Sequence, residues 1–305
     1  MSLNAKETVS APSSAAPQRE HSPYRGFVAG VFSGVSKLAV GHPFDTIKVR
    51  LQTSPPDRFK GPLDCLLKTC RNEGVRAVYK GATPPLVGWM CMDSVMLGSL
   101  HNYRALIKEH VYKGQPLDVV GHGFAGILAG WTVSFIAAPV EHVKARLQVQ
   151  YHRVGQKPRY NGPIDCTKQL LKGHGIPGLY HGLCSTLLFR TWFFAWWGSY
   201  EVFTQMFKKH TDLSGPAINF WAGGLSAQVF WITSYPSDVI KQRIMTDPLE
   251  PGERKFPRWK DAAKAVYKEN GWKGYWRGFV PCFLRAFPAN ATALFVFEAV
   301  MKVLP

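Results

Sequence analysis

Three eight-residue stretches decide the fold of this chain: PFDTIKVR at 43–50, PVEHVKAR at 139–146 and PSDVIKQR at 236–243. All three contain a proline, an acid two residues later, a lysine three residues after the acid, and a final arginine. The prolines lie 96 and 97 residues apart in a chain of 305 residues. Self-similarity at a fixed period indicates that the chain consists of copies of one structural unit.

A second pattern follows each stretch at a similar distance. It joins a polar residue and a glycine to a later aromatic–base–glycine triplet: EGVRAVYKG at 73–81, HGIPGLYHG at 174–182 and NGWKGYWRG at 270–278. Between the two patterns, GPLDC at 61–65 resembles GPIDC at 162–166. A soluble helical repeat array is the alternative, but its usual period of roughly 20 to 50 residues is about half of the period seen here.

Each unit is predicted to contain a long helix, a polar loop with a short helix, and a second long helix. The first long helices are expected at 26–53, 118–149 and 214–246, the short helices at 62–72, 163–173 and 258–269, and the second long helices at 82–108, 183–208 and 279–303. The expected organisation is a disordered tail at 1–22 followed by repeats at 23–115, 116–212 and 213–305.

The charge balance is strongly basic, with 37 Lys and Arg against 20 Asp and Glu. A net charge of +17 indicates a polyanionic partner, either nucleic acid or an anionic membrane surface. The mean hydropathy of −0.10 is typical of a soluble protein. However, 119–140 and 213–237 carry no formal charge over 22 and 25 residues, and each could cross a hydrocarbon core about 30 Å thick.

The N-terminal segment and the cysteines exclude several classes of protein. The first 22 residues are rich in Ser, Ala and Pro and contain no apolar run, so they are not a secretory signal, and any targeting information is expected to be internal. The six cysteines form no CxxC pair and no zinc-like cluster with histidine. We therefore expect no disulfide, no metal site and no cofactor other than bound lipid.

The two repeated patterns resemble the signature of the mitochondrial carrier family over about residues 24–304. The resemblance implies an all-α integral membrane fold, with six transmembrane helices in three pseudo-symmetric repeats and short matrix helices. It also implies a monomeric, multi-pass protein of the mitochondrial inner membrane that is no enzyme and carries a metabolite by alternating access.

One branch of the family is especially similar. LRAFPANA at 284–291 and YHGLCSTLL at 180–188 look like the branch with the carnitine/acylcarnitine and ornithine-type basic amino acid carriers. Those carriers have an arginine and an acid on the fourth long helix, whereas this chain has Arg190-Thr191. The exact substrate, and the choice between exchange and one-way transport, stay open.

The acid and lysine of each first pattern lie about one helical turn apart, after a proline that kinks the helix. They could pair within one helix, or each acid could pair with the lysine of a neighbouring repeat. Because charges inside a membrane are costly unless they are paired, the second arrangement is favoured, and the resemblance implies the same. The predicted matrix gate consists of Asp45, Lys48, Glu141, Lys144, Asp238 and Lys241, with Gln52 and Gln148 as bracing glutamines.

Ionisable residues in the middle of the second long helices are candidate substrate contacts. They are Arg285, Arg190 and Asp93, and Arg285 matches a family contact because it lies seven residues after Gly278. The alternative for each is a structural ion pair across the bundle. Arginines with one acid suit a substrate that carries a carboxylate and a cation. The aromatic run at 192–197 could contact that cation or could face lipid.

A second gate is expected at the cytosolic end of the second long helices. The family pattern there is aromatic, acid, two residues and a base. Tyr200-Glu201 and Phe297-Glu298 match its first half, but no base follows at the expected place. Solvated surface carboxylates are the alternative for Glu201 and Glu298.

The aromatic–base–glycine triplets precede the second long helices, whose free N–H groups form anion sites. The resemblance implies that cardiolipin binds there; plain anchoring at the lipid interface is the alternative. The predicted cardiolipin contacts are Gly81, Gly182, Gly278, Tyr79, Tyr180 and Trp276.

Two other functions compete with a carrier. A nucleic-acid-binding protein would suit the basic charge, but no binding motif is present and the basic residues recur at the boundaries of each repeat instead of forming one stripe. A membrane enzyme would need a catalytic triad, paired carboxylates, a metal cluster or a nucleotide loop, and the sequence contains none of these patterns. A small metabolite and membrane lipid are therefore the expected partners.

Overall fold

The computed structural model describes residues 23–150, 159–250 and 252–303, and within these ranges helices are joined by turns and loops, with no strand. The first long helices of the repeats are α1 (Pro23–Thr53), α4 (Val119–Val149) and α8 (Gly215–Thr246). The short helices are α2 (Pro62–Glu73), α5 (Pro163–Leu179) and α9 (Trp259–Asn270). The second long helices are α3 (Thr83–His110), the pair α6 (Leu183–Thr191) and α7 (Phe193–His210), and α10 (Phe279–Val303). Three short 3₁₀ helices complete the described elements: Pro56–Arg58, Val75–Tyr79 and Gly271–Trp276.

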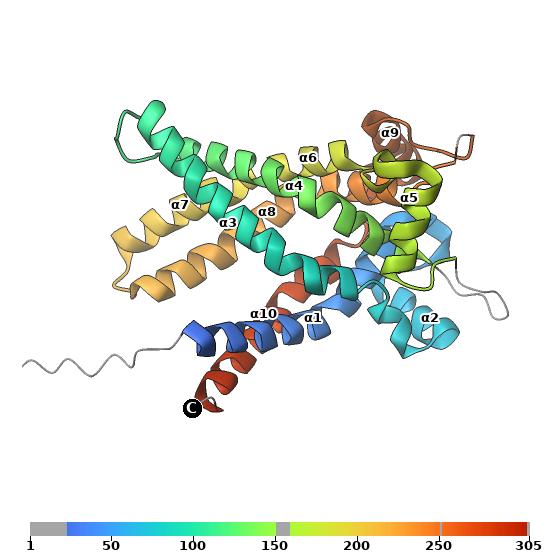
Figure 1. Cartoon of the computed structure of the whole chain (residues 1–305), viewed down its shortest axis with the longest axis horizontal. Coiled ribbons are helices and arrows are strands. Elements are labelled where there is room, and N and C mark those ends of the chain that lie inside the picture. The colour runs from blue at the N-terminus through green and yellow to red at the C-terminus, as the bar shows by residue number, and fades with distance from the viewer. Residues whose placement is uncertain (1–22, 151–158, 251, 304–305) are drawn as a thin grey trace, which may run out of the picture.

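The long helices run roughly side by side, and α2, α5 and α9 gather at one end of the bundle (Figure 1). Each repeat packs against the next, since α3 lies on α4, α7 on α8, and α10 on α1. The first long helices α1, α4 and α8 also contact one another pairwise. Three units related in this way close into a ring around a central axis.

The second repeat differs from the expected helix at 183–208. The helix is interrupted at Trp192, which separates α6 from α7 directly after Arg190 and Thr191. Within the described residues, α4 is the one helix that passes a test of length and apolarity for crossing a membrane, and half of its most apolar stretch is buried in the bundle.

The motif proline lies inside each first long helix, where it removes one backbone donor. Because proline has no N–H, the carbonyl four residues earlier loses its helical partner. The Tyr79 hydroxyl donates to the carbonyl of Ala39, four residues before Pro43, at 3.1 Å. The Tyr180 hydroxyl donates to Phe135, four residues before Pro139, at 3.0 Å. Two triplet tyrosines thus satisfy carbonyls that the kinks leave without a partner.

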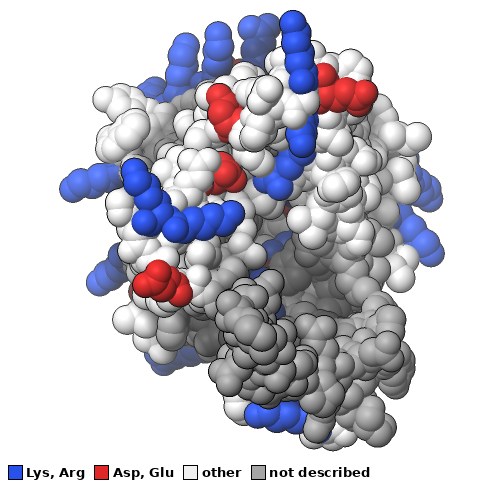
Figure 2. Space-filling model, turned by 90° about the vertical axis from the view of Figure 1, so that its left-hand side faces the viewer, with Lys and Arg blue, Asp and Glu red and all other residues white. Residues whose placement is uncertain are grey.

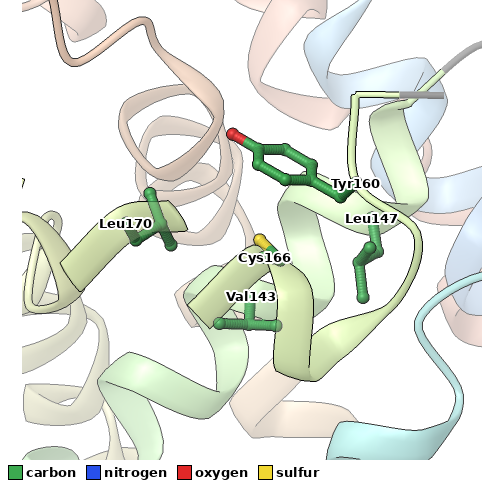
Figure 3. Packing of buried hydrophobic residues seen from close by; sticks show 5 residues of the cluster. All are labelled: Val143, Leu147, Tyr160, Cys166 and Leu170. Atoms are coloured by element: carbon green, nitrogen blue, oxygen red, sulfur yellow. The ribbon is translucent and has the colours of Figure 1, made fainter. Parts of the chain in front are cut away.

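The short helices dock on the first long helices through one repeated apolar cluster. In the second repeat it contains Val143 and Leu147 from α4, Cys166 and Leu170 from α5, and Tyr160 from the loop between them (Figure 3). The corresponding clusters are Ile47, Leu51, Phe59 and Cys65 in the first repeat, and Ile240, Ile244, Ala262 and Phe256 in the third.

These clusters explain two of the cysteines. Cys65 and Cys166 are completely buried, and Ala262 takes the same place in the third repeat. Burial raises the pKa of both thiols to about 11. A small apolar side chain therefore suits this position in all three repeats.

Candidate functional site

A central cavity of about 230 Å³ lies between the long helices. Figure 2 looks onto the end of the bundle opposite the short helices, where a hollow recedes between the helices and basic side chains project around it. Eight charged residues line the cavity: Asp45, Lys48, Glu141, Lys144, Arg190, Asp238, Lys241 and Arg285. Because five of these eight are basic and three are acidic, the described lining favours an anionic group.

Six of these residues form a ring of ion pairs between repeats, called the ion-pair ring below. Lys144 Nζ lies 2.7 Å from Asp45 Oδ2, Lys241 Nζ 2.9 Å from Glu141 Oε2, and Lys48 Nζ 2.8 Å from Asp238 Oδ2. Each pair joins a different two of the three repeats. The structure thus brings the six predicted gate residues together, while their role as a gate stays a prediction.

The two predicted glutamine braces differ in their contacts. The Gln52 amide donates to Asp238 Oδ2 at 3.0 Å, directly beside the Lys48 pair. The Gln148 amide donates to the Thr46 hydroxyl at 3.2 Å. Gln52 therefore supports one pair of the ring, whereas Gln148 links α4 to α1 next to it.

The two predicted substrate arginines contact the acids of the same ring. Arg285 Nη1 lies 2.8 Å from Asp45 Oδ1, and Arg190 Nη2 lies 2.8 Å from Glu141 Oε1. Asp45 and Glu141 therefore each hold one lysine and one arginine. Arg190 Nε is buried without a hydrogen-bond partner among the described residues. The Asp93 side chain lies outside the described part of the structure.

Aromatic rings form one wall of the cavity. From the run at 192–197, Phe193 and Trp196 line it. Trp192 is exposed, and Phe194 packs edge-to-face on Phe124 at 5.7 Å. The run is therefore divided between the cavity and the outer surface.

Other cavity aromatics come from parts of the sequence that the motifs do not mark. Phe189 and Trp231 also line the cavity. Lys241 Nζ lies 4.0 Å from the ring centre of Phe189, and Lys48 Nζ lies 4.4 Å from that of Trp231. The sequence could have indicated Phe189 as a cavity residue, because it lies four residues before Phe193 and thus on the same helix face. No motif marks Trp231.

An apolar recess of about 360 Å³ adjoins the two pairs of Glu141. It shares five lining residues with the central cavity: Met92, Glu141, Arg190, Phe193 and Trp196. Its remaining lining is apolar and comes from α3, α4 and α7: Met96, Leu97, Val133 and Trp197. A ligand that reached Arg190 would thus have apolar surface within reach of the rest of its body.

The triplet glycines have left-handed backbone conformations, with φ of +76° at Gly81, +90° at Gly182 and +84° at Gly278. A Cβ at Gly81 would lie 3.0 Å from the Lys144 carbonyl oxygen, and one at Gly278 would lie 3.1 Å from that of Lys48. Glycine is required because these turns approach the backbone of the next repeat beside the ion-pair ring.

The triplet bases also reach the next repeat. Lys80 Nζ donates to the Gln150 carbonyl at 3.0 Å, and His181 Nε2 donates to that of Ile244 at 2.8 Å. Arg277 donates to the carbonyls of Ser54 and Pro55 at 2.9 and 3.0 Å. Each base thus caps the C-terminal end of the next repeat's first long helix, where free carbonyls favour a donor. The third aromatic, Trp276, stacks on Tyr235.

Of the two residues predicted for the cytosolic gate, the structure describes the side chain of Glu201. Glu201 Oε2 lies 3.6 Å from Nε2 of His122, and the Gln205 amide donates to its other oxygen at 2.9 Å. The Glu298 side chain lies outside the described residues. His122 belongs to α4, which the aromatic–acid pattern on the second long helices did not include.

Known proteins that resemble this chain carry solutes. A family model described as mitochondrial carrier protein matches residues 19–111, 115–211 and 213–305. The mitochondrial substrate carrier family protein L of Dictyostelium discoideum is 41% identical over 92% of this chain and 96% of its own length. The human mitochondrial carnitine/acylcarnitine carrier protein is 34% identical over 93% of this chain and 95% of its own length. The mitochondrial basic amino acids transporter of Bos taurus is 34% identical over 90% of this chain and 91% of its own length. These matches confirm the resemblance and the all-α fold of three repeats, and the chain belongs to the mitochondrial carrier family.

Proposed function

We propose that this protein spans the mitochondrial inner membrane and carries a small carboxylate-bearing metabolite, such as carnitine or an acylcarnitine, or an amino acid, by alternating access. The observation that carries the proposal is the pairing of Arg285 and Arg190 with Asp45 and Glu141, two acids of the ion-pair ring. Substrate-binding groups and gate groups thereby share the same carboxylates.

This sharing supports a coupling between binding and gate opening. A substrate carboxylate that bound Arg285 or Arg190 would replace a ring acid as the partner of that guanidinium. The released acid would lose one of its two cations, so the contacts between repeats would rearrange when substrate is present. An arginine without a partner at mid-membrane costs roughly 2.5 kcal/mol or more, which is why the empty carrier keeps the acid in place.

The rest of the cavity supports a substrate with a second, less polar part. Of the cavity aromatics, Trp196 offers an aromatic face to a cation such as a quaternary ammonium. Basic side chains of the cavity already lie over the rings of Phe189, Phe193 and Trp231. The apolar recess beside Arg190 would accommodate an acyl chain or an apolar side chain. An acylcarnitine uses all three features, whereas a basic amino acid uses the arginines and the aromatic wall only.

The test is a counter-exchange screen with purified protein in liposomes that contain cardiolipin. Carnitine, acylcarnitines of increasing chain length, basic amino acids, other amino acids and simple carboxylates are compared as internal substrates. We expect uptake to require a carboxylate and to be faster for substrates that also carry a cation or an apolar group. Equal uptake of a matched substrate whose carboxylate is replaced by an amide would contradict the proposal.

We also propose that the carrier works as a monomer with cardiolipin at the starts of its second long helices. The support for the lipid sites is that α3 and α6 begin beside Gly81 and Gly182 without a side-chain cap, near basic and aromatic side chains. The lipid would strengthen junctions that Lys80, His181 and Arg277 already form between repeats.

A further inference from the structure

The three arginines that end the first pattern provide an internal comparison. In the first repeat, Arg50 contacts both oxygens of Glu73 on the short helix α2, at 2.6 and 3.0 Å. In the third repeat, Arg243 lies 2.7 Å from Glu269 on the short helix α9. Both arginines are buried, and each has a carboxylate beside it as counter-charge. These pairs join each short helix to the end of the first long helix.

Arg146 occupies the same place in the second repeat, but its contacts are to neutral acceptors. It is 7% exposed. Its Nε donates to His142 Nε2 at 2.6 Å, and its Nη2 donates to the Asp247 carbonyl at 2.7 Å. The residue that corresponds to Glu73 is His174.

The neighbouring Asp247 does not supply Arg146 with a carboxylate partner either. The Asp247 carboxylate accepts from the backbone N–H groups of Lys255 and Phe256 instead. Among the described residues no acid forms an ion pair with Arg146, and the sequence of 151–158 contains neither Asp nor Glu. A buried arginine without a counter-charge is costly, since burial removes the water that otherwise solvates it.

A polar pocket of about 170 Å³ opens at this arginine. Arg159, Gln169 and His174 line it together with Arg146, at the end of the bundle where the short helices gather. Glu250 also lines it, but this carboxylate is held by Arg159 at 2.7 Å. The pocket therefore contains two guanidinium groups, one imidazole and one amide against a single acid that is already paired.

We propose that this pocket, called the Arg146 pocket below, binds a small oxyanion of the phosphate or carboxylate class. The anion would supply the second repeat with the negative charge that Glu73 and Glu269 supply to the first and third. The planar fork of an arginine matches such oxyanions, and His174 adds a further donor. The Gln169 amide already donates to the Arg159 carbonyl and to Asp165. The pocket is separate from the central cavity, so the proposal does not depend on the transported substrate.

The test compares thermal unfolding of the purified full-length carrier in neutral detergent, with inorganic phosphate and with chloride at equal ionic strength. A ligand that binds only the folded state raises the melting temperature, so phosphate should produce a saturable increase that chloride does not. His174→Glu restores the carboxylate of the other repeats. We expect this variant to melt higher without ligand and to lose the response to phosphate.

Lys172→Gln is the matched control. Like His174→Glu it makes the formal charge of α5 more negative by one, but Lys172 is exposed and does not line the Arg146 pocket. This variant should keep the full response to phosphate. A response that survives in His174→Glu, or that is absent from the unmodified protein with every oxyanion tried, overturns the proposal.

A lipid headgroup could supply the same phosphate chemistry, and a second arm separates the two sources. Cardiolipin is titrated into the unmodified protein and into His174→Glu. If free phosphate is the ligand, cardiolipin stabilises both proteins equally, because its sites lie elsewhere. If phosphate has no effect and the response to cardiolipin is lost in His174→Glu alone, the pocket binds a lipid phosphate. Equal responses of both proteins to both ligands contradict an oxyanion site at Arg146.

Discussion

Single side chains in the cavity serve two purposes at once. Arg285 contacts Asp45, and Asp45 also contacts Lys144, so one carboxylate joins the proposed substrate site to the ion-pair ring. The sequence identified both arginines as mid-membrane charges but did not reveal their partners. That information depends on the order of helices around the bundle, because Asp45 and Arg285 lie 240 residues apart.

Arg285 should be needed for transport of the carboxylate-bearing substrate. Arg285→Lys keeps the charge but loses the planar fork, so we expect uptake into liposomes to fall about tenfold or more; Arg285→Ala should abolish it. The measurement is initial uptake of the substrate found in the counter-exchange screen, with thermal unfolding as the folding control. Unchanged uptake by a folded Arg285→Ala carrier would remove this residue from the site.

The tyrosines of the triplets should matter for stability through the proline kinks. Tyr79→Phe and Tyr180→Phe each remove a hydroxyl that satisfies a carbonyl left free by a proline. We expect each change to lower the free energy of unfolding by about 1 kcal/mol, measured by thermal unfolding in detergent. Tyr267→Phe is the control, since Tyr267 is 60% exposed on α9. Equal melting temperatures of all three variants would argue against this role.

At the scale of helices, the short helix of each repeat is joined to the first long helix by apolar packing, and in the first and third repeats also by an ion pair. In the first repeat, burial opposes ionisation of Glu73, but hydrogen bonds from Arg50 and Lys80 hold its pKa below the ordinary value of 4.5. A carboxylate with a lowered pKa in the folded state stabilises the protein above its unfolded pKa, and the contribution is lost as the pH falls through the folded pKa.

Glu73→Gln should therefore destabilise the carrier in a pH-dependent way. The difference in melting temperature between the variant and the unmodified protein should be constant above about pH 5 and should shrink as the pH falls below 4.5. Glu109→Gln provides the control, since Glu109 is exposed near the end of α3. A difference that grows on acidification would contradict the ion pair with Arg50 as its cause.

Much of the element order was predictable, because the repeated prolines, glycines and aromatic triplets mark the same helix starts and kinks three times. The sequence favoured ion pairs between repeats but did not determine which lysine pairs with which ring acid. The pairs follow from the contacts among α1, α4 and α8 in the structure. The interruption at Trp192 could not be foreseen, since neither proline nor glycine marks it. The hydroxyl contacts of Tyr79 and Tyr180 could have been inferred from the paired spacing of proline and triplet, but the triplets were interpreted as cardiolipin contacts.

At the scale of the whole molecule, every repeat contacts the next through the same set of groups: a ring lysine, a triplet glycine and a triplet base. Cardiolipin bound at these junctions should stabilise the closed arrangement. We expect the melting temperature of the detergent-purified carrier to rise with added cardiolipin, following the linkage between binding and stability. A zwitterionic lipid added at the same molar ratio serves as the control, and an equal rise with it would leave only general anchoring in the lipid.

The central claim is that the ion-pair ring closes the cavity by joining the repeats, and a charge exchange across one pair tests it most directly. Asp45→Lys and Lys144→Asp should each abolish uptake into cardiolipin-containing liposomes, because each places like charges in a pair now separated by 2.7 Å. The double variant restores opposite charges between the first and second repeats. It should recover part of the uptake, and only part, because Arg285 stays beside the new lysine. A folded double variant that is as inactive as both single variants would contradict the account.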